Sequence, residues 1–200
     1  MSLSLLQEGR KIAVVKPIQT GFPQDTEFLE SITGNKVPVF NTYSFSLPAA
    51  PSVAAEHEAK KIEIKQIISN IRKLEKEFDC VIVEGIGGIA VPIAENYLVA
   101  DLIQDLNYPL LVASRATLGT INHTVLTIEF AKQKELDVLG FVISGYGEQT
   151  NDIVIKTAPD EISRITNLPC LFKLPILSEI SYVSVSGLLA NKRSLFLKCT

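Results

Sequence analysis

The sequence predicts an α/β protein whose mostly parallel sheet is covered by helices on both faces. Short apolar runs alternate with amphipathic helical patterns about five times along the chain, as in strands joined by crossover helices. The most apolar run, Cys80 to Val83, reads CVIV without a polar break and stops at Glu84 and a glycine-rich turn. Such a run is typical of a strand buried on both faces of a parallel sheet that ends at a binding site.

The elements follow from the period of their apolar residues. A strand is expected where Val, Ile, Leu or Phe run together and stop at polar or glycine residues, at 12–15, 37–45, 80–83, 110–113, 138–143 and 170–174. A helix is expected where apolar residues recur every three or four positions, at 22–34, 53–59, 64–78, 98–106, 120–131 and 152–165, and a helix end at 1–10. Residues 89–93 are predicted to be a connecting segment, and the chain from Ser181 to be helical or irregular.

The composition indicates one globular domain over residues 1–200, since 46% of the residues are hydrophobic. The net charge of −3, without a basic stripe, argues against a nucleic-acid partner and against a polybasic membrane surface. No apolar run is long enough to cross a membrane, and the N-terminus has no signal-peptide block. Three widely spaced cysteines, Cys80, Cys170 and Cys199, indicate reduced thiols. These features predict a cytoplasmic protein.

Several polar residues stand just after predicted strands and should therefore meet at one edge of the sheet. They are Lys16, Thr20, Glu84, Arg115, Asn122 and Ser144. The alternative is a set of solvated strand ends. Asp25 begins a helical pattern and is either its N-cap or a ligand. The helix start near Asn122 is a natural anion site, unless Asn122 serves only as a cap.

Three motifs, in this order and spacing, resemble dethiobiotin synthetase. They are Lys16-Pro17-Ile18-Gln19-Thr20-Gly21, Val83-Glu84-Gly85-Ile86-Gly87-Gly88 and Leu118-Gly119-Thr120-Ile121-Asn122-His123. The resemblance extends from about Lys11 to Pro175. The first and third motifs together are fairly specific, whereas the second also suits related amidoligases of the same superfamily.

The resemblance implies a three-layer fold like that of P-loop NTPases, and a homodimer. It implies that carbon dioxide is joined to 7,8-diaminopelargonic acid with ATP and Mg²⁺, which closes the ureido ring of dethiobiotin. By resemblance, Lys16 is catalytic and contacts the carbamate and the γ-phosphate, and Asp25 and Glu84 hold the metal. The implied substrate-binding residues are Thr20, Gly119, Thr120 and Asn122, and the implied nucleotide-binding residues are Glu84, Gly85, Gly87, Ser144 and Pro175.

The sequence departs from the family at its start. The 200 residues contain no G-x-x-x-x-G-K-[ST] phosphate loop. The family's first strand, loop and helix are expected to be missing, which would leave strand edges unpaired and weaken ATP binding. Ser144 stands where the family usually has a base-reading Asn, and Ala50-Pro51-Ser52 where it commonly has Ser-Pro-His.

Two other functions compete with this interpretation. A non-catalytic α/β binding or regulatory chain would keep the fold and the anion-binding helix start without turnover. A nucleotide-switch ATPase of the partitioning kind has little support, because residues 181–200 show no basic amphipathic face.

Overall fold

The computed structural model describes residues 1–147 and 152–190. The contacts between residues divide the chain into two compact units. Of the described residues, the first unit holds 1–105 and 179–190, and the second holds 106–147 and 152–178. That the whole chain forms one domain stays a prediction.

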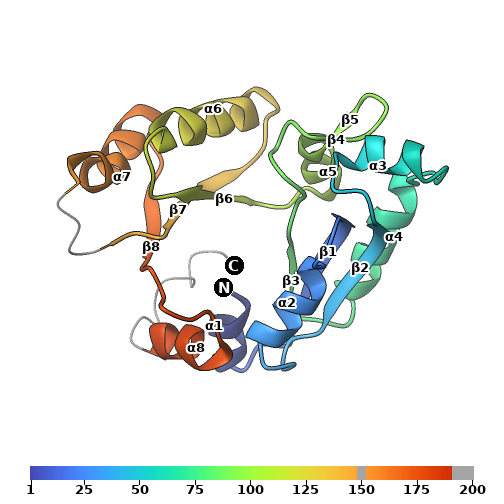
Figure 1. Cartoon of the computed structure of the whole chain (residues 1–200), viewed down its shortest axis with the longest axis horizontal. Coiled ribbons are helices and arrows are strands. Elements are labelled where there is room, and N and C mark those ends of the chain that lie inside the picture. The colour runs from blue at the N-terminus through green and yellow to red at the C-terminus, as the bar shows by residue number, and fades with distance from the viewer. Residues whose placement is uncertain (148–151, 191–200) are drawn as a thin grey trace. The chain divides into compact units, whose positions relative to one another are not determined.

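The first unit is built on β1 (Ile12–Thr20), which lies between β2 (Val39–Phe45) and β3 (Cys80–Val83) and is parallel to both (Figure 1). Because β1 is the central strand, its apolar residues are buried on both faces of the sheet. The strand is longer than predicted, since β2 pairs with it as far as Thr20.

Helices contact both faces of this sheet. The helices of this unit are α1 (Ser2–Gln7), α2 (Asp25–Ile32), α3 (Pro51–His57), α4 (Ile64–Leu74), α5 (Val99–Leu106) and α8 (Tyr182–Ala190). On one face Leu3 and Leu5 of α1 pack with Ile12 and Val14, and Tyr182 of α8 packs against the same cluster. The alternate residues of β1 face the other way, where α3 and α4 contact the strand. Tyr182 also accepts a hydrogen bond of 2.6 Å from Lys36 Nζ.

Two predictions in this unit were wrong. β3 is an end strand, so the CVIV run is half-buried and not fully buried. The predicted connecting segment 89–93 leads into an antiparallel hairpin of β4 (Pro92–Ala94) and β5 (Tyr97–Leu98). Tyr97 Oη donates a 2.7 Å hydrogen bond to the Asp105 carboxylate. Burial and this carboxylate raise the pKa of Tyr97.

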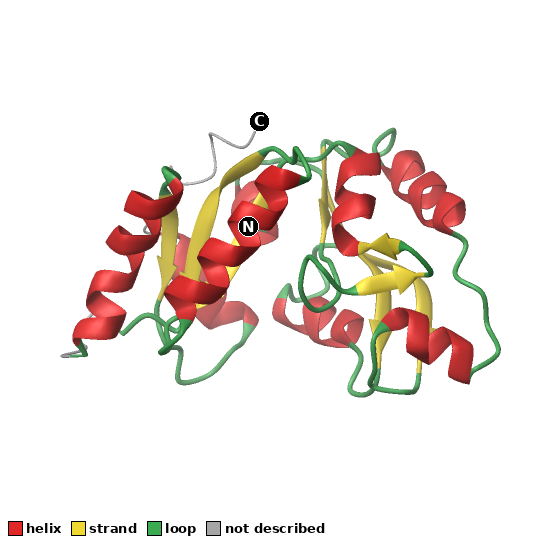
Figure 2. Cartoon of the chain, turned by 90° about the horizontal axis from the view of Figure 1, so that it is seen from above, coloured by secondary structure: helices red, strands yellow, loops and turns green. Residues whose placement is uncertain are grey.

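The second unit repeats the parallel pattern around a different central strand. β7 (Val138–Ser144) lies between β6 (Leu110–Arg115) and β8 (Cys170–Leu174). α6 (Thr120–Gln133) and α7 (Ile153–Thr166) pack beside this sheet, as Figure 2 shows with helices in red and strands in yellow. A small set of residues from these elements forms the core, namely Val112, Ile128, Phe141, Ile143 and Ile162.

The α/β class with parallel strands is confirmed, but in the described residues the parallel strands form two three-stranded sheets instead of one. Among the described residues, β3 pairs only with β1, and β6 only with β7. Within this part of the chain, each therefore keeps one unpaired edge.

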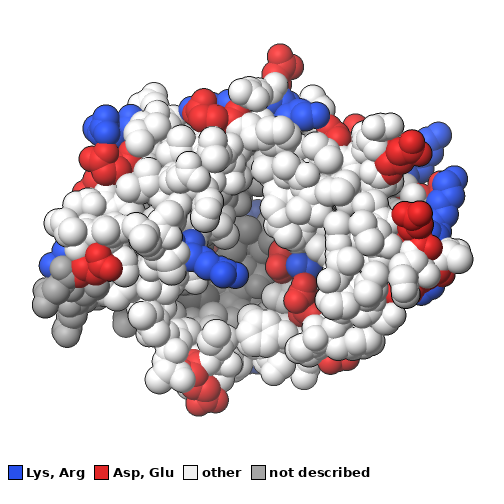
Figure 3. Space-filling view, turned by 45° about the horizontal axis from the view of Figure 1, so that its top comes forward, with Lys and Arg blue, Asp and Glu red and all other residues white. Residues whose placement is uncertain are grey.

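The surface and the thiols agree with the composition. Lys and Arg side chains are interspersed with Asp and Glu over the face in Figure 3. Cys80 and Cys170 are half-buried thiols outside any disulfide of the described residues, while Cys199 lies beyond those residues. None of the helices in the described part of the chain has the length and apolarity to cross a membrane.

Candidate functional site

Lys16 is a buried ammonium that three oxygen atoms surround. Its residue is only 4% exposed. Nζ lies 2.8 Å from Asp25 Oδ2 and 3.0 Å from Glu84 Oε1, and it donates to the Gly85 carbonyl at 3.0 Å. The three N–H donors of the ammonium thus have three acceptors. Lys16 was expected just after a strand, but it lies in the middle of β1, and this cluster holds its charge at a fixed point in the interior.

Asp25 is the first residue of α2 and does not cap it. Gln24 occupies the N-cap position, and its side chain makes no cap hydrogen bond to the helix start. The Asp25 carboxylate instead turns to Lys16 and stays half exposed, with 54% of its side chain accessible. Of the two roles that the sequence allowed, the structure therefore excludes the cap.

Glu84 begins the glycine-rich turn after β3. Its backbone N–H donates to the Val15 carbonyl at 2.8 Å, which continues the β1–β3 ladder by one residue. Gly87 has φ of +65°, and a Cβ there would lie 3.0 Å from Val91. The turn therefore requires glycine at this position and leaves the backbone bare of side chain next to Glu84.

The cluster joins one buried cation to two accessible carboxylates. Both carboxylates are about half exposed, so an incoming ligand can reach them and displace them from Lys16. The Lys16 ammonium is therefore already in position to bind an anion. Mg²⁺ usually takes one or two carboxylates and keeps waters and phosphate oxygens as its other ligands. The donor set of Asp25 and Glu84 fits that requirement.

Thr20 ends β1 opposite Phe45 and leads into a loop that packs tightly on the segment after β2. Gly21 has φ of +77°, and a Cβ there would lie 2.9 Å from Pro48 Cβ. Glu58, at the end of α3, holds that segment by accepting from Ser46 N at 2.6 Å and from Ser46 Oγ at 2.8 Å. The loop beside Thr20 is thereby fixed from outside the cluster.

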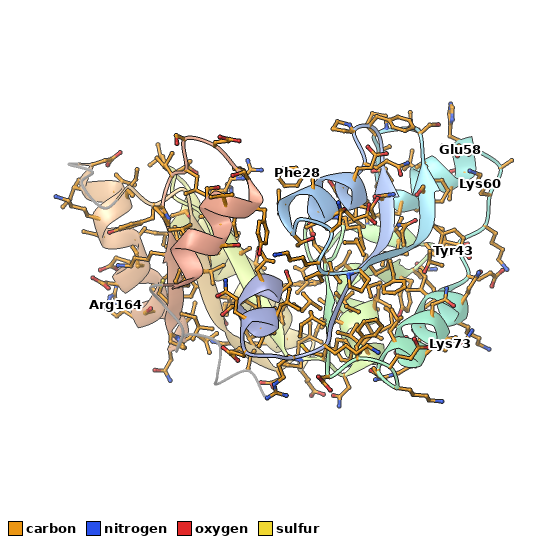
Figure 4. The ribbon with its side chains drawn as sticks, turned by 90° about the horizontal axis from the view of Figure 1, so that it is seen from below. Phe28, Tyr43, Glu58, Lys60, Lys73 and Arg164 are labelled. Carbon is orange, nitrogen blue, oxygen red and sulfur yellow. The ribbon has the colours of Figure 1, made fainter. Side chains whose placement is uncertain are left out.

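The Glu58 contacts predict a dependence of stability on acid. Hydrogen bonds from Lys60 and Ser46 lower the pKa of Glu58 from 4.5 to about 2, and Figure 4 shows Glu58 and Lys60 as neighbours. Because the folded pKa lies below the unfolded one, this carboxylate stabilises the fold above pH 4.5. Its contribution disappears as the pH falls through about 2.

Glu58→Gln should therefore lower the free energy of unfolding at pH 7, and the difference from the native chain should shrink between pH 4.5 and 2. Urea unfolding at several pH values measures this. Glu56→Gln, an exposed neighbour on α3, is the matched control. A difference between the Glu58 variant and the native chain that is constant with pH would contradict the prediction.

In the second unit, three candidate residues stand at the carboxyl ends of neighbouring strands. Arg115 ends β6 in register with Ser144, which ends β7. Pro175 directly follows β8, and Tyr146 N donates to the Leu174 carbonyl at 2.8 Å. Arg115 and Ser144 are exposed. This edge therefore offers accessible groups to a ligand.

The start of α6 forms a second polar feature of this unit. Gly119 is the N-cap with φ of +91°, so helical backbone begins at Thr120. Among the described residues, the Thr120 hydroxyl is buried without a hydrogen-bond partner. Asn122 is exposed and lies inside the helix, so it is not the cap. The unpaired N–H groups of the first turn favour an anion.

The structure thus brings Lys16, Asp25, Glu84 and Gly85 together in the first unit. Arg115, Ser144 and the α6 start belong to the second unit, and a single site that includes both sets stays a prediction. The sequence analysis assigned no role to Gln19, Asn41 or Ser44. Hydrogen bonds join the side chains of these three residues and end at the Lys16 carbonyl. The one signal for them was a Gln in the middle of the first motif.

Comparison with known proteins finds relatives that match most of the chain. A family model described as "AAA domain" matches residues 1–184. An ATP-dependent dethiobiotin synthetase from Thermodesulfovibrio yellowstonii is 33% identical over 195 residues, covering 89% of this chain and 81% of the relative. The enzyme of the same name from Bacillus velezensis is 33% identical and covers 94% of this chain and 84% of the relative. That from Aquifex aeolicus is 34% identical, with shares of 90% and 82%.

Solved structures with a similar fold are more distant in sequence. The septum site-determining protein MinD of Pyrococcus horikoshii, in complex with Mg-ADP, aligns with a TM-score of 0.58 at 13% identity, over 100% of this chain and 90% of that one. The MinC:MinD complex of Aquifex aeolicus gives 0.57 at 10% identity, over 98% and 78%. At such identities the likeness shows the fold alone.

Proposed function

This chain belongs to the dethiobiotin synthetase family, and we propose that it is an ATP-dependent ligase of biotin biosynthesis that converts 7,8-diaminopelargonic acid to dethiobiotin. The observation that carries the proposal is the buried Lys16 ammonium held between Asp25 and Glu84. Lys16 comes from the first motif and Glu84 from the second of the motifs that carry the family resemblance, and Asp25 follows the first motif by four residues.

The proposed reaction has three steps. An amine of the diamine adds to carbon dioxide and loses a proton, which gives a carbamate. The carbamate oxygen attacks the γ-phosphorus of ATP, and ADP leaves. The second amine then attacks the carbonyl carbon of this mixed anhydride, and phosphate leaves as the ureido ring closes. Negative charge is present throughout, so positioning and charge neutralisation provide most of the catalysis.

In the first unit, the proposed roles follow from the charges. Lys16 exchanges its carboxylate partners for the carbamate and the γ-phosphate, to which it donates hydrogen bonds. Thr20 hydrogen-bonds the substrate. Asp25 and Glu84 would hold Mg²⁺ directly or through water, and the ion would neutralise phosphate charge. The bare backbone at Gly85 and Gly87 allows close approach of the nucleotide.

In the second unit, we assign the substrate carboxylate to the start of α6, at Gly119, Thr120 and Asn122. The buried Thr120 hydroxyl, which has no partner within the described ranges 1–147 and 152–190, supports this assignment, because an unpaired polar group in the interior gains a hydrogen bond when a ligand arrives. Ser144 and Pro175 would contact the nucleotide. A cytoplasmic homodimer completes the proposal, with the carboxylate bound across the dimer interface.

A functional test must separate the two substrates. Because the 200 residues contain no phosphate loop, we expect this chain to bind MgATP with a dissociation constant weaker than about 1 mM and to turn over little. It should still bind the diamine. Isothermal calorimetry with ATP and Mg²⁺, with and without the diamine, measures both. 2,3-Diaminononane, which has the same amines without the carboxylate, serves as the control ligand.

The outcomes separate the candidates. Diamine binding that is lost with the control ligand supports the substrate half of the proposal. Micromolar ATP binding would contradict the expected weakness and support full ligase activity. Absence of diamine binding would overturn the proposal and favour a non-catalytic binding or regulatory chain.

A further inference from the structure

Gln19 is a buried amide near the carboxyl end of β1 that has no role in the proposed reaction. Its residue is 3% exposed. Nε2 has two hydrogens and donates to the two nearer acceptors, Gln24 Oε1 at 2.8 Å and Ser44 Oγ at 2.9 Å, while Thr26 Oγ1 lies further away at 3.3 Å. Oε1 accepts from the Thr26 backbone N–H at 3.3 Å. A buried amide with so many partners is costly to disturb.

The hydrogen bonds continue from Gln19 to the backbone of Lys16. Ser44 Oγ donates to Asn41 Oδ1 at 2.9 Å, and Asn41 Nδ2 donates to the Lys16 carbonyl at 2.7 Å. The two ends fix the direction of every bond, since a carbonyl only accepts and a backbone N–H only donates. Gln19, Ser44 and Asn41 therefore form one directed chain from Thr26 to Lys16.

This series of hydrogen bonds connects the backbone next to Asp25 with the backbone of Lys16, and these two residues form the ion pair. Thr26 directly follows Asp25, and the Lys16 carbonyl belongs to the residue whose ammonium binds Asp25 at 2.8 Å. The start of α2 has no side-chain cap of its own, and the first N–H groups of a helix have no intrahelical acceptor. Gln19 supplies one to Thr26 from a neighbouring element.

We propose that Gln19, which Ser44 and Asn41 connect to the Lys16 backbone, is a positioning residue that fixes the start of α2 through Thr26 and so holds Asp25 against Lys16. The importance for ligand binding rests on the proposed function. Without Gln19 the half-exposed Asp25 would stand on a fraying helix end. The ammonium and the carboxylate would then no longer meet the ligand at a fixed separation.

The first experiment needs no ligand. Gln19→Met keeps the length of the side chain but removes its donors and its acceptor, whereas Gln19→Glu keeps an acceptor for Thr26. We expect hydrogen exchange of the Thr26 amide to be about fivefold faster in Gln19→Met and to return toward the native rate in Gln19→Glu. Gln7→Met, exposed on α1, is the control. An unchanged Thr26 rate in Gln19→Met would overturn the proposal.

The second experiment asks whether Gln19 acts through Asp25. Calorimetry measures the affinity for the diamine with carbon dioxide and Mg²⁺ in four chains: native, Gln19→Met, Asp25→Asn and the double variant. We expect Gln19→Met to weaken binding about fivefold in the native background and not at all in Asp25→Asn. Equal losses in both backgrounds would overturn the positioning role and indicate a purely structural one.

The two experiments separate the proposals. If the native chain does not bind the diamine, the proposed function fails, and the Thr26 exchange rate alone decides the positioning role. If the diamine binds but the Thr26 exchange rate is the same in Gln19→Met as in the native chain, the proposed function stands and the positioning role of Gln19 fails.

Discussion

Replacing Lys16 with methionine is expected to abolish the effect of carbon dioxide on diamine binding. In the native chain the carbamate formed from the diamine should gain a charge-assisted hydrogen bond from the buried ammonium, which is worth about 10- to 100-fold in affinity. Methionine has similar length and no charge, so it fills the space without that bond. The half-exposed Asp25 and Glu84 stay in contact with water, so the fold should survive.

The measurement is calorimetric titration of the diamine in buffers with and without carbon dioxide. Carbon-13 NMR with labelled carbon dioxide reports the carbamate directly, and its signal should appear with the native chain and be absent with Lys16→Met. Lys65→Met, exposed on α4, removes a lysine away from the cluster and should keep the effect. If carbon dioxide changed the diamine affinity equally in Lys16→Met and Lys65→Met, Lys16 would have no role in binding the carbamate.

Gly140→Ala is expected to have the largest effect on stability. Gly140 lies in the central strand β7 with φ of +148°, a conformation that side chains rarely adopt. A Cβ there would lie 2.6 Å from the Pro169 carbonyl oxygen, which accepts the Phe141 N–H at 3.1 Å. The methyl group would therefore both strain the backbone and push away a ladder acceptor, for a cost of about 3 kcal/mol or more.

Gly145→Ala provides the matched control. Gly145 also has positive φ, +75°, but nothing lies within 4 Å of the added Cβ. It should therefore lose only the conformational term of about 1 kcal/mol. Urea unfolding followed by circular dichroism gives both free energies, and hydrogen exchange at Phe141 locates the change. Similar losses in the two variants would mean that β8 moves aside without cost.

Much of this protein could be predicted from local pattern. The period of the apolar residues placed the parallel strands and most helices, because a strand or helix must turn one face to the core. Chain order put Lys16 and Glu84 just after predicted strands, and the structure joins them by an ion pair, although Lys16 lies inside β1 and not at its end. The three motifs gave the family, which the relatives confirm.

Tertiary structure decided which candidates meet and how deeply they are buried. The CVIV run is more apolar than β1, yet β1 is central and β3 is an end strand, since pairing order depends on distant segments. The Asp25 carboxylate pairs with Lys16 instead of capping α2, because β1 places the Lys16 ammonium 2.8 Å from it. The series of hydrogen bonds from Gln19 to Lys16 passes through Ser44, which lies 25 residues from Gln19 in sequence. Hydrogen bonds between residues of neighbouring strands depend on the register in which the strands pair, and no local sequence pattern specifies that register.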